Sequence, residues 1–325
     1  MDRYVFAVAE STFCCWQPDA AQLNRDFLAT FDSSYFSYPA QLFASELEAE
    51  NSQRASIALR MAYHHAMETL FSLLGATAQA PQLVPAWLPH CTTTSLRAVV
   101  NSIACGKPML TQAGRHRVTF DMLAATVHRW CWVDETPIGA TASRFATFWR
   151  RIAHEWLSQH NIAEYNSLKH GFRFAPGGFT LQFGEEMEYG VPAPEENMVT
   201  VGHSDYGSSV ILARPMIDGK AAGHHFTMTR SSLNWSVEAM ILQLQLLSWS
   251  INNVVAGLRC LNGAAPSTVQ FRRPEDPLVF ENAWESDIGV FASHHQEALP
   301  SSRISLLPKH ELVRELESRA TKESP

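Results

Sequence analysis

Charged residues and paired cysteines are both scarce in this sequence. Only 18% of the 325 residues are charged and 46% are apolar, a balance that excludes a disordered tail or a coiled-coil rod. The six cysteines are scattered and form no C-x-x-C pair, so neither a disulfide scaffold nor a zinc ribbon is expected. We therefore expect a globular protein of a reducing compartment, the cytoplasm.

The signatures of three common enzyme classes are also missing. The sequence has no G-x-G-x-x-G, no Walker A string and no G-x-S-x-G, which disfavours dinucleotide binding, P-loop chemistry and the α/β-hydrolase mechanism. The net charge is −7, so any contact with nucleic acid needs a local basic patch. The longest apolar run, from Trp235 to Leu258, includes Glu238 and Asn252, which a lipid-facing helix disfavours. We expect no membrane partner.

Helical periodicity dominates the first half of the chain. From Glu46 to Gln79, apolar residues recur at three- and four-residue steps, which predicts a long amphipathic helix. Shorter helices are predicted over Thr94–Ala104 and Thr119–Cys131, and a second long helix runs from Thr141 and continues or restarts near Asn161. Gly171 then supplies a left-handed helix cap.

After Gly171 the period of the apolar residues changes from 3.6 to 2, which predicts an antiparallel sheet. The candidate strands lie at Phe179–Phe183, Met198–Val201, Ser209–Ala213 and His225–Thr229. The Asp218-Gly219 pair between two of them predicts a hairpin turn, because a type I′ turn needs positive φ at both central positions.

The last third of the chain begins with another long helix, over Val237–Leu258, that has two apolar faces. Such a helix is either sandwiched between layers or presents one face to a partner subunit. Strand-like pieces follow at Thr268–Phe271 and Leu278–Phe280, and a charged helix is predicted over Lys309–Arg319.

These patterns together predict a mainly helical α+β fold, a helical bundle body with an antiparallel β insertion. The expected segments are residues 1–45 as an N-terminal strand and loop segment, 46–171 as the helical body, 172–232 as the antiparallel insertion, and 233–325 as a long helix plus a C-terminal segment packing on the body.

The most distinctive string runs from Tyr165 to Gly171, at the end of a predicted helix. Asn166 and His170 are four residues apart and share a helix face, with Lys169 at its edge. At a phosphodiester, an imidazole can move a proton near neutral pH while an ammonium group stabilises negative charge. The alternative is structural, because Lys and His suit the last turn of a helix and Gly171 suits its cap.

The segment Asn166–Gly171 resembles the N-x-x-x-H part of the R-x(4–6)-H signature of HEPN domains, and Arg60–Leu74 resembles their early core helix. The resemblance implies two helical protomers that face each other, with paired Arg and His residues forming a metal-independent endoribonuclease site. Other HEPN members are inactive and bind nucleotides or partner proteins.

The signature arginine is absent from this chain. The spacing from His170 allows three positions, which hold Ala163, Glu164 and Tyr165. Loss of the arginine favours an inactive or divergent member. The candidates to replace it in space are Arg150, Arg151 and Arg173.

A second cluster lies on the predicted long helix, where Arg60, His64 and Glu68 follow one another at four-residue steps. One interpretation is an exposed, salt-bridged helix edge. In a buried version, Glu68 would orient the His64 ring and raise its basicity beside His170.

Three functional hypotheses follow. The first is metal-independent RNA cleavage in a stress or antiviral defence response, by a homodimer without a cofactor, with His170 as acid and base, Asn166 positioning the phosphate or the imidazole, and Lys169 stabilising charge. The second is a non-catalytic sensor or partner-binding module on the same helices. The third is a metal-dependent enzyme that uses clustered histidines such as His203 and His224 with Asp205.

Overall fold

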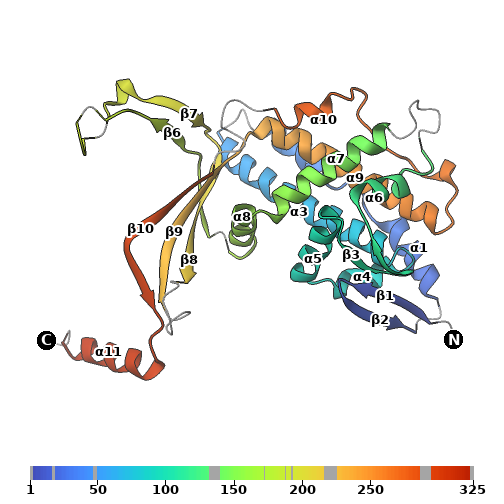
Figure 1. Ribbon diagram of the computed structural model, residues 1–325, viewed down its shortest axis with the longest axis horizontal. Helices are drawn as coiled ribbons and strands as arrows, with labels where there is room; N and C mark the ends of the chain where they lie inside the picture. The colour runs from blue at the N-terminus through green and yellow to red at the C-terminus, as the bar shows by residue number, and fades with distance from the viewer. Residues whose placement is uncertain are drawn as a thin grey trace.

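The computed structural model describes residues 3–16, 19–46, 50–131, 140–171, 173–186, 188–191, 193–215, 225–285 and 294–322. The protein is a mainly helical α+β fold in which the strand pairs are antiparallel, as the sequence predicts. Figure 1 shows a helical body from which a long β-sheet projects.

Two long helices, α3 (Ser52–Gln79) and α9 (Val237–Leu261), pack against each other in the body. The surrounding helices are α1 (Ala20–Thr30), α2 (Ser37–Glu46), α4 (Val84–His90), α5 (Thr93–Ala104), α6 (Phe120–Val127), α7 (Ala140–Leu157) and α10 (Val279–Asn282). Contacts of α9 with α1, α2, α3, α6 and α10 cover both of its apolar faces. Of the two alternatives that the sequence leaves open for this helix, these contacts match the one in which it is sandwiched between layers.

Among the described residues, α9 is the single helix whose length and apolar composition would suit a membrane span. Its most apolar stretch is 72% buried within the body. Burial of this kind is typical of a core helix, whose apolar residues face neighbouring helices instead of lipid.

Two small hairpins also belong to the body: β1 (Tyr4–Val8) with β2 (Ser11–Cys15), and β3 (Pro108–Thr111) with β4 (Gly114–Arg117). The expected strands at Thr268–Phe271 and Leu278–Phe280 are wrong, because a 3-10 turn, Pro266–Thr268, and α10 lie there. The intervening backbone bonds to side chains of α9: Asn252 donates to the Gln270 carbonyl, and Asn253 pairs with the Arg272 backbone. These bonds take the place of a strand ladder.

The first run of helices ends with α8 (Gln159–Lys169) and Gly171, whose φ of 99° confirms the predicted left-handed position. Next come β5 (Phe174–Pro176), β6 (Thr180–Phe183), a 3-10 turn (Glu195–Asn197), β7 (Val199–His203), β8 (Gly207–Pro215) and β9 (His225–Asn234). β6 and β7 form a separate hairpin. The predicted turn at Asp218-Gly219 lies outside the described residues.

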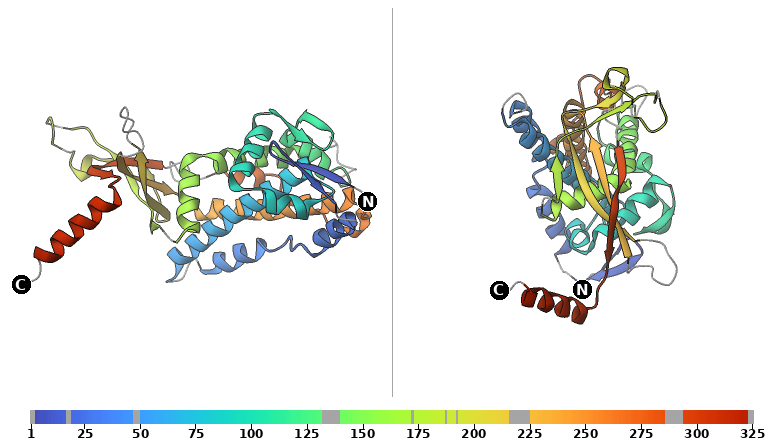
Figure 2. Two further views of the ribbon diagram at one scale, coloured as in Figure 1. Left: turned by 90° about the horizontal axis from the view of Figure 1, so that it is seen from below. Right: turned by 90° about the vertical axis from the view of Figure 1, so that its left-hand side faces the viewer.

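The sequence predicts that the C-terminal segment packs on the body, but residues 294–322 lie with the projecting sheet instead. β10 (His294–Ser305) pairs with β9, which gives a four-stranded sheet of order β10-β9-β8-β5, and α11 (Lys309–Lys322) follows it. We call residues 173–234 and 294–322 the arm. Figure 2 shows the arm extending away from the helices, with α11 at its far end.

Candidate functional site

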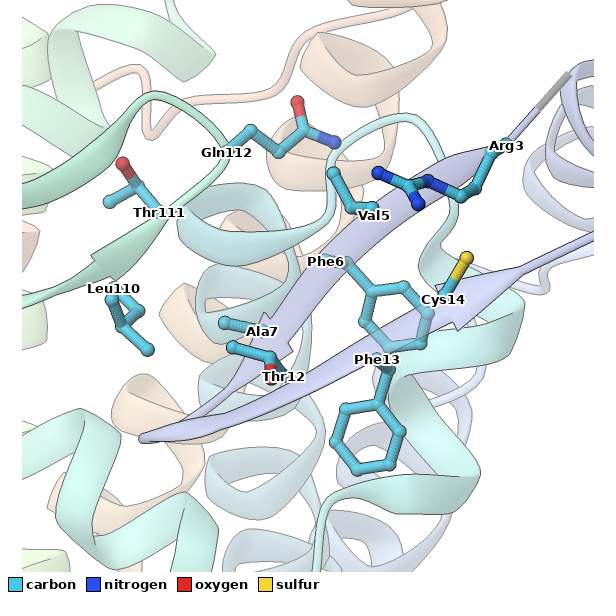
Figure 3. Close-up of a pocket in the computed structure, with 10 residues that line it drawn as sticks. All are labelled: Arg3, Val5, Phe6, Ala7, Thr12, Phe13, Cys14, Leu110, Thr111 and Gln112. Atoms are coloured by element: carbon cyan, nitrogen blue, oxygen red, sulfur yellow. The ribbon is translucent and has the colours of Figure 1, made fainter.

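A pocket of about 410 Å³ lies between the two hairpins of the body (Figure 3). Its lining is mostly apolar side chains and hydroxyl groups, together with one guanidinium, Arg3, and one thiol, Cys14. Phe6 and Phe13 stack on each other at its floor, with ring centroids 5.3 Å apart. None of the residues that the sequence singles out lines this pocket, so it offers no support for the predicted chemistry.

The predicted catalytic residues lie at the exposed end of α8. Asn166, Lys169 and His170 all face solvent, and His170 is the C-cap residue, whose backbone N–H donates to the Asn166 carbonyl at 3.0 Å. In the part of the chain that the structure describes, no arginine is bonded to the His170 ring. The geometry here matches the structural alternative, in which these residues finish a helix.

Lys169 does not point to His170. Its ammonium nitrogen is 3.7 Å from a carboxylate oxygen of Glu68 and 5.3 Å from the ring centre of Tyr165. The Tyr165 hydroxyl donates to the same carboxylate at 2.5 Å. Burial and the adjacent Glu68 charge raise the pKa of Tyr165 far above its usual value, so this phenol stays protonated.

The three arginines proposed as replacements lie elsewhere. Arg150 pairs with Asp121 at 2.6 Å, and the Arg151 guanidinium lies 4.3 Å from the ring centre of Trp284. Arg173 is exposed, and its backbone N–H donates to the Ser167 carbonyl. The structure therefore does not bring a guanidinium to the predicted imidazole.

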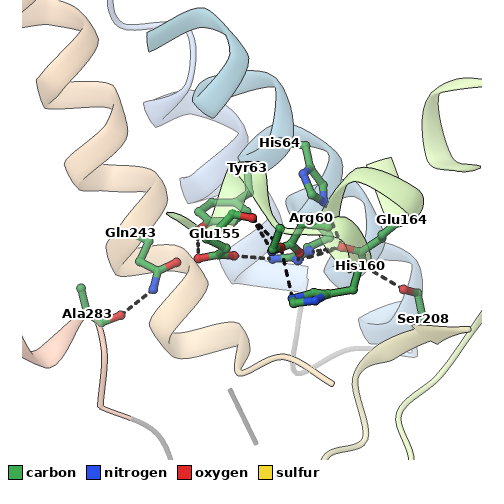
Figure 4. Close-up of polar contacts among 11 residues, drawn as sticks. Arg60, Tyr63, His64, Glu155, His160, Glu164, Ser208, Gln243 and Ala283 are labelled. Atoms are coloured by element: carbon green, nitrogen blue, oxygen red, sulfur yellow. Dashed lines mark hydrogen bonds and ion pairs between the residues drawn. The ribbon is translucent and has the colours of Figure 1, made fainter. Parts of the chain in front are cut away.

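The buried polar centre of the molecule is instead Glu164, one of the three residues at which the HEPN signature would place arginine (Figure 4). Its side chain is 2% exposed. One carboxylate oxygen accepts hydrogen bonds from Arg60 at 2.7 and 3.0 Å and lies 3.0 Å from Nε2 of His64. The other accepts a hydrogen bond from the Ser208 hydroxyl at 2.7 Å.

A second carboxylate, that of Glu155, faces the same guanidinium. Arg60 Nη1 is 3.6 Å from Glu155, whose other oxygen accepts a hydrogen bond from the Tyr63 hydroxyl at 2.9 Å. Asn161 accepts from Arg60 Nη2 at 2.8 Å. The guanidinium also lies between the rings of Tyr63 and Trp235, 5.2 and 5.1 Å from their centres.

The charges of this cluster follow from these contacts. Burial alone would raise the pKa of Glu164, but Arg60 and the His64 hydrogen bond outweigh it and hold the pKa at about 2. Burial and the Arg60 charge lower the pKa of His64. At neutral pH the carboxylate is therefore ionised and the imidazole is neutral, so His64 Nε2–H donates to Glu164.

The structure corrects the interpretation of the Arg60, His64 and Glu68 row. Arg60 and His64 are 2% and 1% exposed, so they do not form an exposed helix edge. The prediction that Glu68 orients His64 is also wrong, because the ring bonds to Glu164. Sequence reasoning missed Glu164 as their partner, although a buried arginine requires an anion to compensate its charge.

This network joins four elements. It links α3 through Arg60, α7 through Glu155, α8 through Glu164 and the base of β8 through Ser208. The Glu164 oxygens are both occupied by protein donors, and the surrounding side chains exclude water. We therefore assign the cluster to holding the arm on the body, and call it the joint.

The histidine hypothesis gains no geometric support. Within the described ranges, no three His, Cys, Asp or Glu side chains gather in a way that could hold a metal ion. Nε2 of His203 lies 3.5 Å from a carboxylate oxygen of Asp205, and both side chains are exposed. His224 lies outside the described residues.

The arm carries an apolar surface that the sequence analysis did not identify. Opposed residues of neighbouring strands share a face of the sheet, and the face alternates along each strand. The register therefore places six apolar side chains on one face, together with Arg230, which lies opposite Ile211. We call the six apolar residues the distal patch: Ile211, Ala213, Pro215, Phe226, Met228 and Ile304. Ile211 is 58% exposed and Ile304 is 44% exposed.

Comparison with models of protein families, with curated proteins and with solved structures finds no match to this chain. Two features of the molecule itself bear on its function: the buried joint and the exposed apolar surface of the arm.

Proposed function

We propose that this protein is a non-catalytic binding module, in which a HEPN-like helical body holds a projecting arm that binds a partner protein. The observation that carries the proposal is the apolar surface of the arm. The distal patch lies on a sheet face, and α11 exposes Leu312, Val313 and Leu316. Contiguous exposed apolar surface of this kind is typical of protein interaction sites.

The joint supports this function because it fixes the arm to a rigid body. A binding surface that is held in place loses less conformational entropy when a partner binds. Beside the joint, the Asn234 side chain donates to the Phe179 carbonyl at 2.7 Å and accepts from its N–H at 2.9 Å. Ser204 donates to the Trp235 carbonyl at 2.9 Å. The Asn234 bonds thus hold two segments of the arm together at its base, and the Ser204 bond joins the arm to Trp235 of the body.

The geometry at His170 favours this proposal over RNA cleavage. A metal-independent nuclease needs a proton-transfer group and a cation directed at the same phosphate. His170 stands on an exposed helix end, and Lys169 is directed at Glu68. RNA cleavage remains the competing prediction, and a second subunit would have to supply the missing arginine.

The cytoplasm is the compartment we propose, with the thiols as support. All six cysteines are free, as expected in a reducing environment. Cys105 and Cys14 are exposed, so oxidising conditions would leave them open to intermolecular pairing.

Incubation of the purified full-length protein with labelled RNA in EDTA tests the proposal against its competitor. We expect no cleavage above a buffer control, and the same result for His170→Ala. The exposed position of His170 means that this variant should fold normally, which circular dichroism can verify. Metal-independent cleavage that disappears in His170→Ala would overturn the proposal.

A further inference from the structure

We infer that the partner of the arm is a second copy of this chain, with α11 of each copy lying across the distal patch of the other about a two-fold axis. This inference rests on the proposed binding function and names the partner. A helix on a sheet face is a standard way to cover apolar surface, and a two-fold axis lets one contact occur twice.

The distal patch and the apolar side of α11 are both exposed in the single chain. On the distal part of the arm, in β8, β10, α11 and the link between the last two, seven large apolar side chains remain between 42% and 61% exposed: Ile211, Ile304, Leu306, Leu307, Leu312, Val313 and Leu316. Leu312 and Leu316 are one helical turn apart and lie on one side of α11. α11 therefore does not cover the distal patch of its own chain.

The link between β10 and α11 explains why the helix points away. Only Leu306, Leu307 and Pro308 separate the two elements. The residue before a proline is restricted to extended conformations, which directs the chain onward from the end of the strand. The views in Figure 2 show α11 leaving the sheet at its tip.

The length of α11 matches the length of the distal patch. The 14 residues of α11 span about 21 Å at 1.5 Å per residue. The five residues of β8 from Ile211 to Pro215 span about 16 Å at 3.3 Å per residue. One α11 helix is therefore long enough to cover one distal patch from end to end.

The exposed apolar area on the distal part of the arm can be compared with the area that a stable dimer buries. With roughly half of each side chain exposed, the seven residues present on the order of 500 Å² of apolar surface per copy. A standard stable interface buries about 800 Å² on each partner. Two symmetric helix-on-sheet contacts, with the polar residues that border them, approach that size.

The charges of α11 and of the sheet are compatible with such a contact. α11 holds four basic and three acidic residues, whereas the whole chain has a net charge of −7. The helix is thus close to neutral or slightly basic in an acidic protein. The strands that bear most of the distal patch, β8 and β9, hold Arg214 and Arg230 and no acidic residue, so the three glutamates of α11 would meet no like charge from these strands.

Light scattering coupled to gel filtration, over a range of concentrations, tests the oligomeric state. We expect a mass near twice the chain mass of 36.3 kDa. Leu312→Asp with Leu316→Asp on the helix should give the monomer mass, and Ile211→Asp on the sheet should do the same. Leu278→Asp is the matched control, because Leu278 is 56% exposed on the body, and it should leave the dimer intact.

Photocrosslinking tests which surfaces meet. A benzoylphenylalanine at position 316 should crosslink to peptides of the distal patch, and mixing isotopically light and heavy chains should show that the link joins two copies. A link within one chain would mean that α11 folds back, which overturns the inference.

The two proposals fail in different ways. A wild-type chain that is monomeric at all concentrations overturns the second-copy inference and leaves the arm as a site for another protein. His170-dependent RNA cleavage overturns the proposed function, whatever the oligomeric state. Circular dichroism of each variant separates lost pairing from lost folding.

Discussion

At the scale of single residues, Glu164 is the most consequential side chain in this protein. Its carboxylate accepts hydrogen bonds from Arg60, His64 and Ser208 in a buried site. Removing one partner of a buried ion pair leaves the other charge uncompensated, at a cost of about 3–5 kcal/mol. A surface ion pair is worth only about 0–1 kcal/mol.

Glu164→Gln should therefore lower the free energy of unfolding by about 3–5 kcal/mol, measured by denaturant titration. The matched control is Glu10→Gln, since Glu10 pairs with Arg115 at 2.9 Å and both side chains are exposed. Its effect should stay under about 1 kcal/mol. Equal effects of the two substitutions would show that the joint does not carry the stability assigned to it.

Acidification should also destabilise the fold through a buried histidine. Burial lowers the pKa of His128 from 6.5 to about 4, and its Nδ1 lies 2.9 Å from the Ala124 carbonyl. The unfolded chain binds a proton at a higher pH than the folded chain, so stability falls as the pH falls from 6.5 towards 4. The loss is on the order of 3 kcal/mol by pH 4.

Unfolding titrations at pH 7, 5.5 and 4 check this prediction. His128→Phe removes the titrating group, and the aromatic ring suits a site flanked by Phe145 and Trp149. The variant should lose part of the decline in stability between pH 6.5 and 4, while the lowered pKa of His64 sustains the remainder. An unchanged pH dependence in this variant would rule out His128 as its source.

At the scale of elements, close helix packing sets constraints that helix propensity does not reveal. A Cβ atom at Gly257 of α9 would lie 2.7 Å from the Val127 carbonyl oxygen and 3.0 Å from its Cα. Ala is favoured over Gly by about 1 kcal/mol in a helix, but overpacking costs about 1–3 kcal/mol.

Gly257→Ala should therefore lower the melting temperature, despite the better helix former. Leu261→Ala at the partly exposed end of the same helix should have a smaller effect. Thermal unfolding followed by circular dichroism measures both variants. A higher melting temperature for Gly257→Ala would contradict the close approach of α6 and α9.

The helices were predictable because their apolar faces have the helical period, and α3 shows it most clearly. The expected strands at Thr268–Phe271 and Leu278–Phe280 were wrong because apolar content alone does not reveal that Asn252 and Asn253 bind the backbone between them. Pairing of β10 with β9 depends on contacts between distant segments, which no local pattern encodes.

The candidate site was less predictable than the fold. The sequence identified Arg60 and His64 but assigned them to Glu68, which is four residues away on the same helix. Their partner Glu164 is 104 and 100 residues distant, and only the packing of α3 on α8 brings it close. The distal patch depends on strand register, which fixes the shared face of Ile211 and Phe226.

At the scale of the whole molecule, the joint should control how firmly the arm is held. Ser208→Ala removes the hydrogen bond from β8 to Glu164. A buried hydrogen bond contributes about 1 kcal/mol, so amide hydrogen exchange at the base of the sheet should accelerate by about fivefold. Thr200→Ala, which removes an exposed bond to Gln182, should leave those rates unchanged, and equal acceleration would contradict the joint.

The central claim is that the arm is a binding surface covered by another copy of the chain. Amide hydrogen exchange of the wild-type protein at low and high concentration tests this most directly. We expect α11 and the distal half of β8 to gain protection as the concentration rises, while the exposed end of α8 at His170 does not. Exchange that is independent of concentration throughout the arm would contradict the claim.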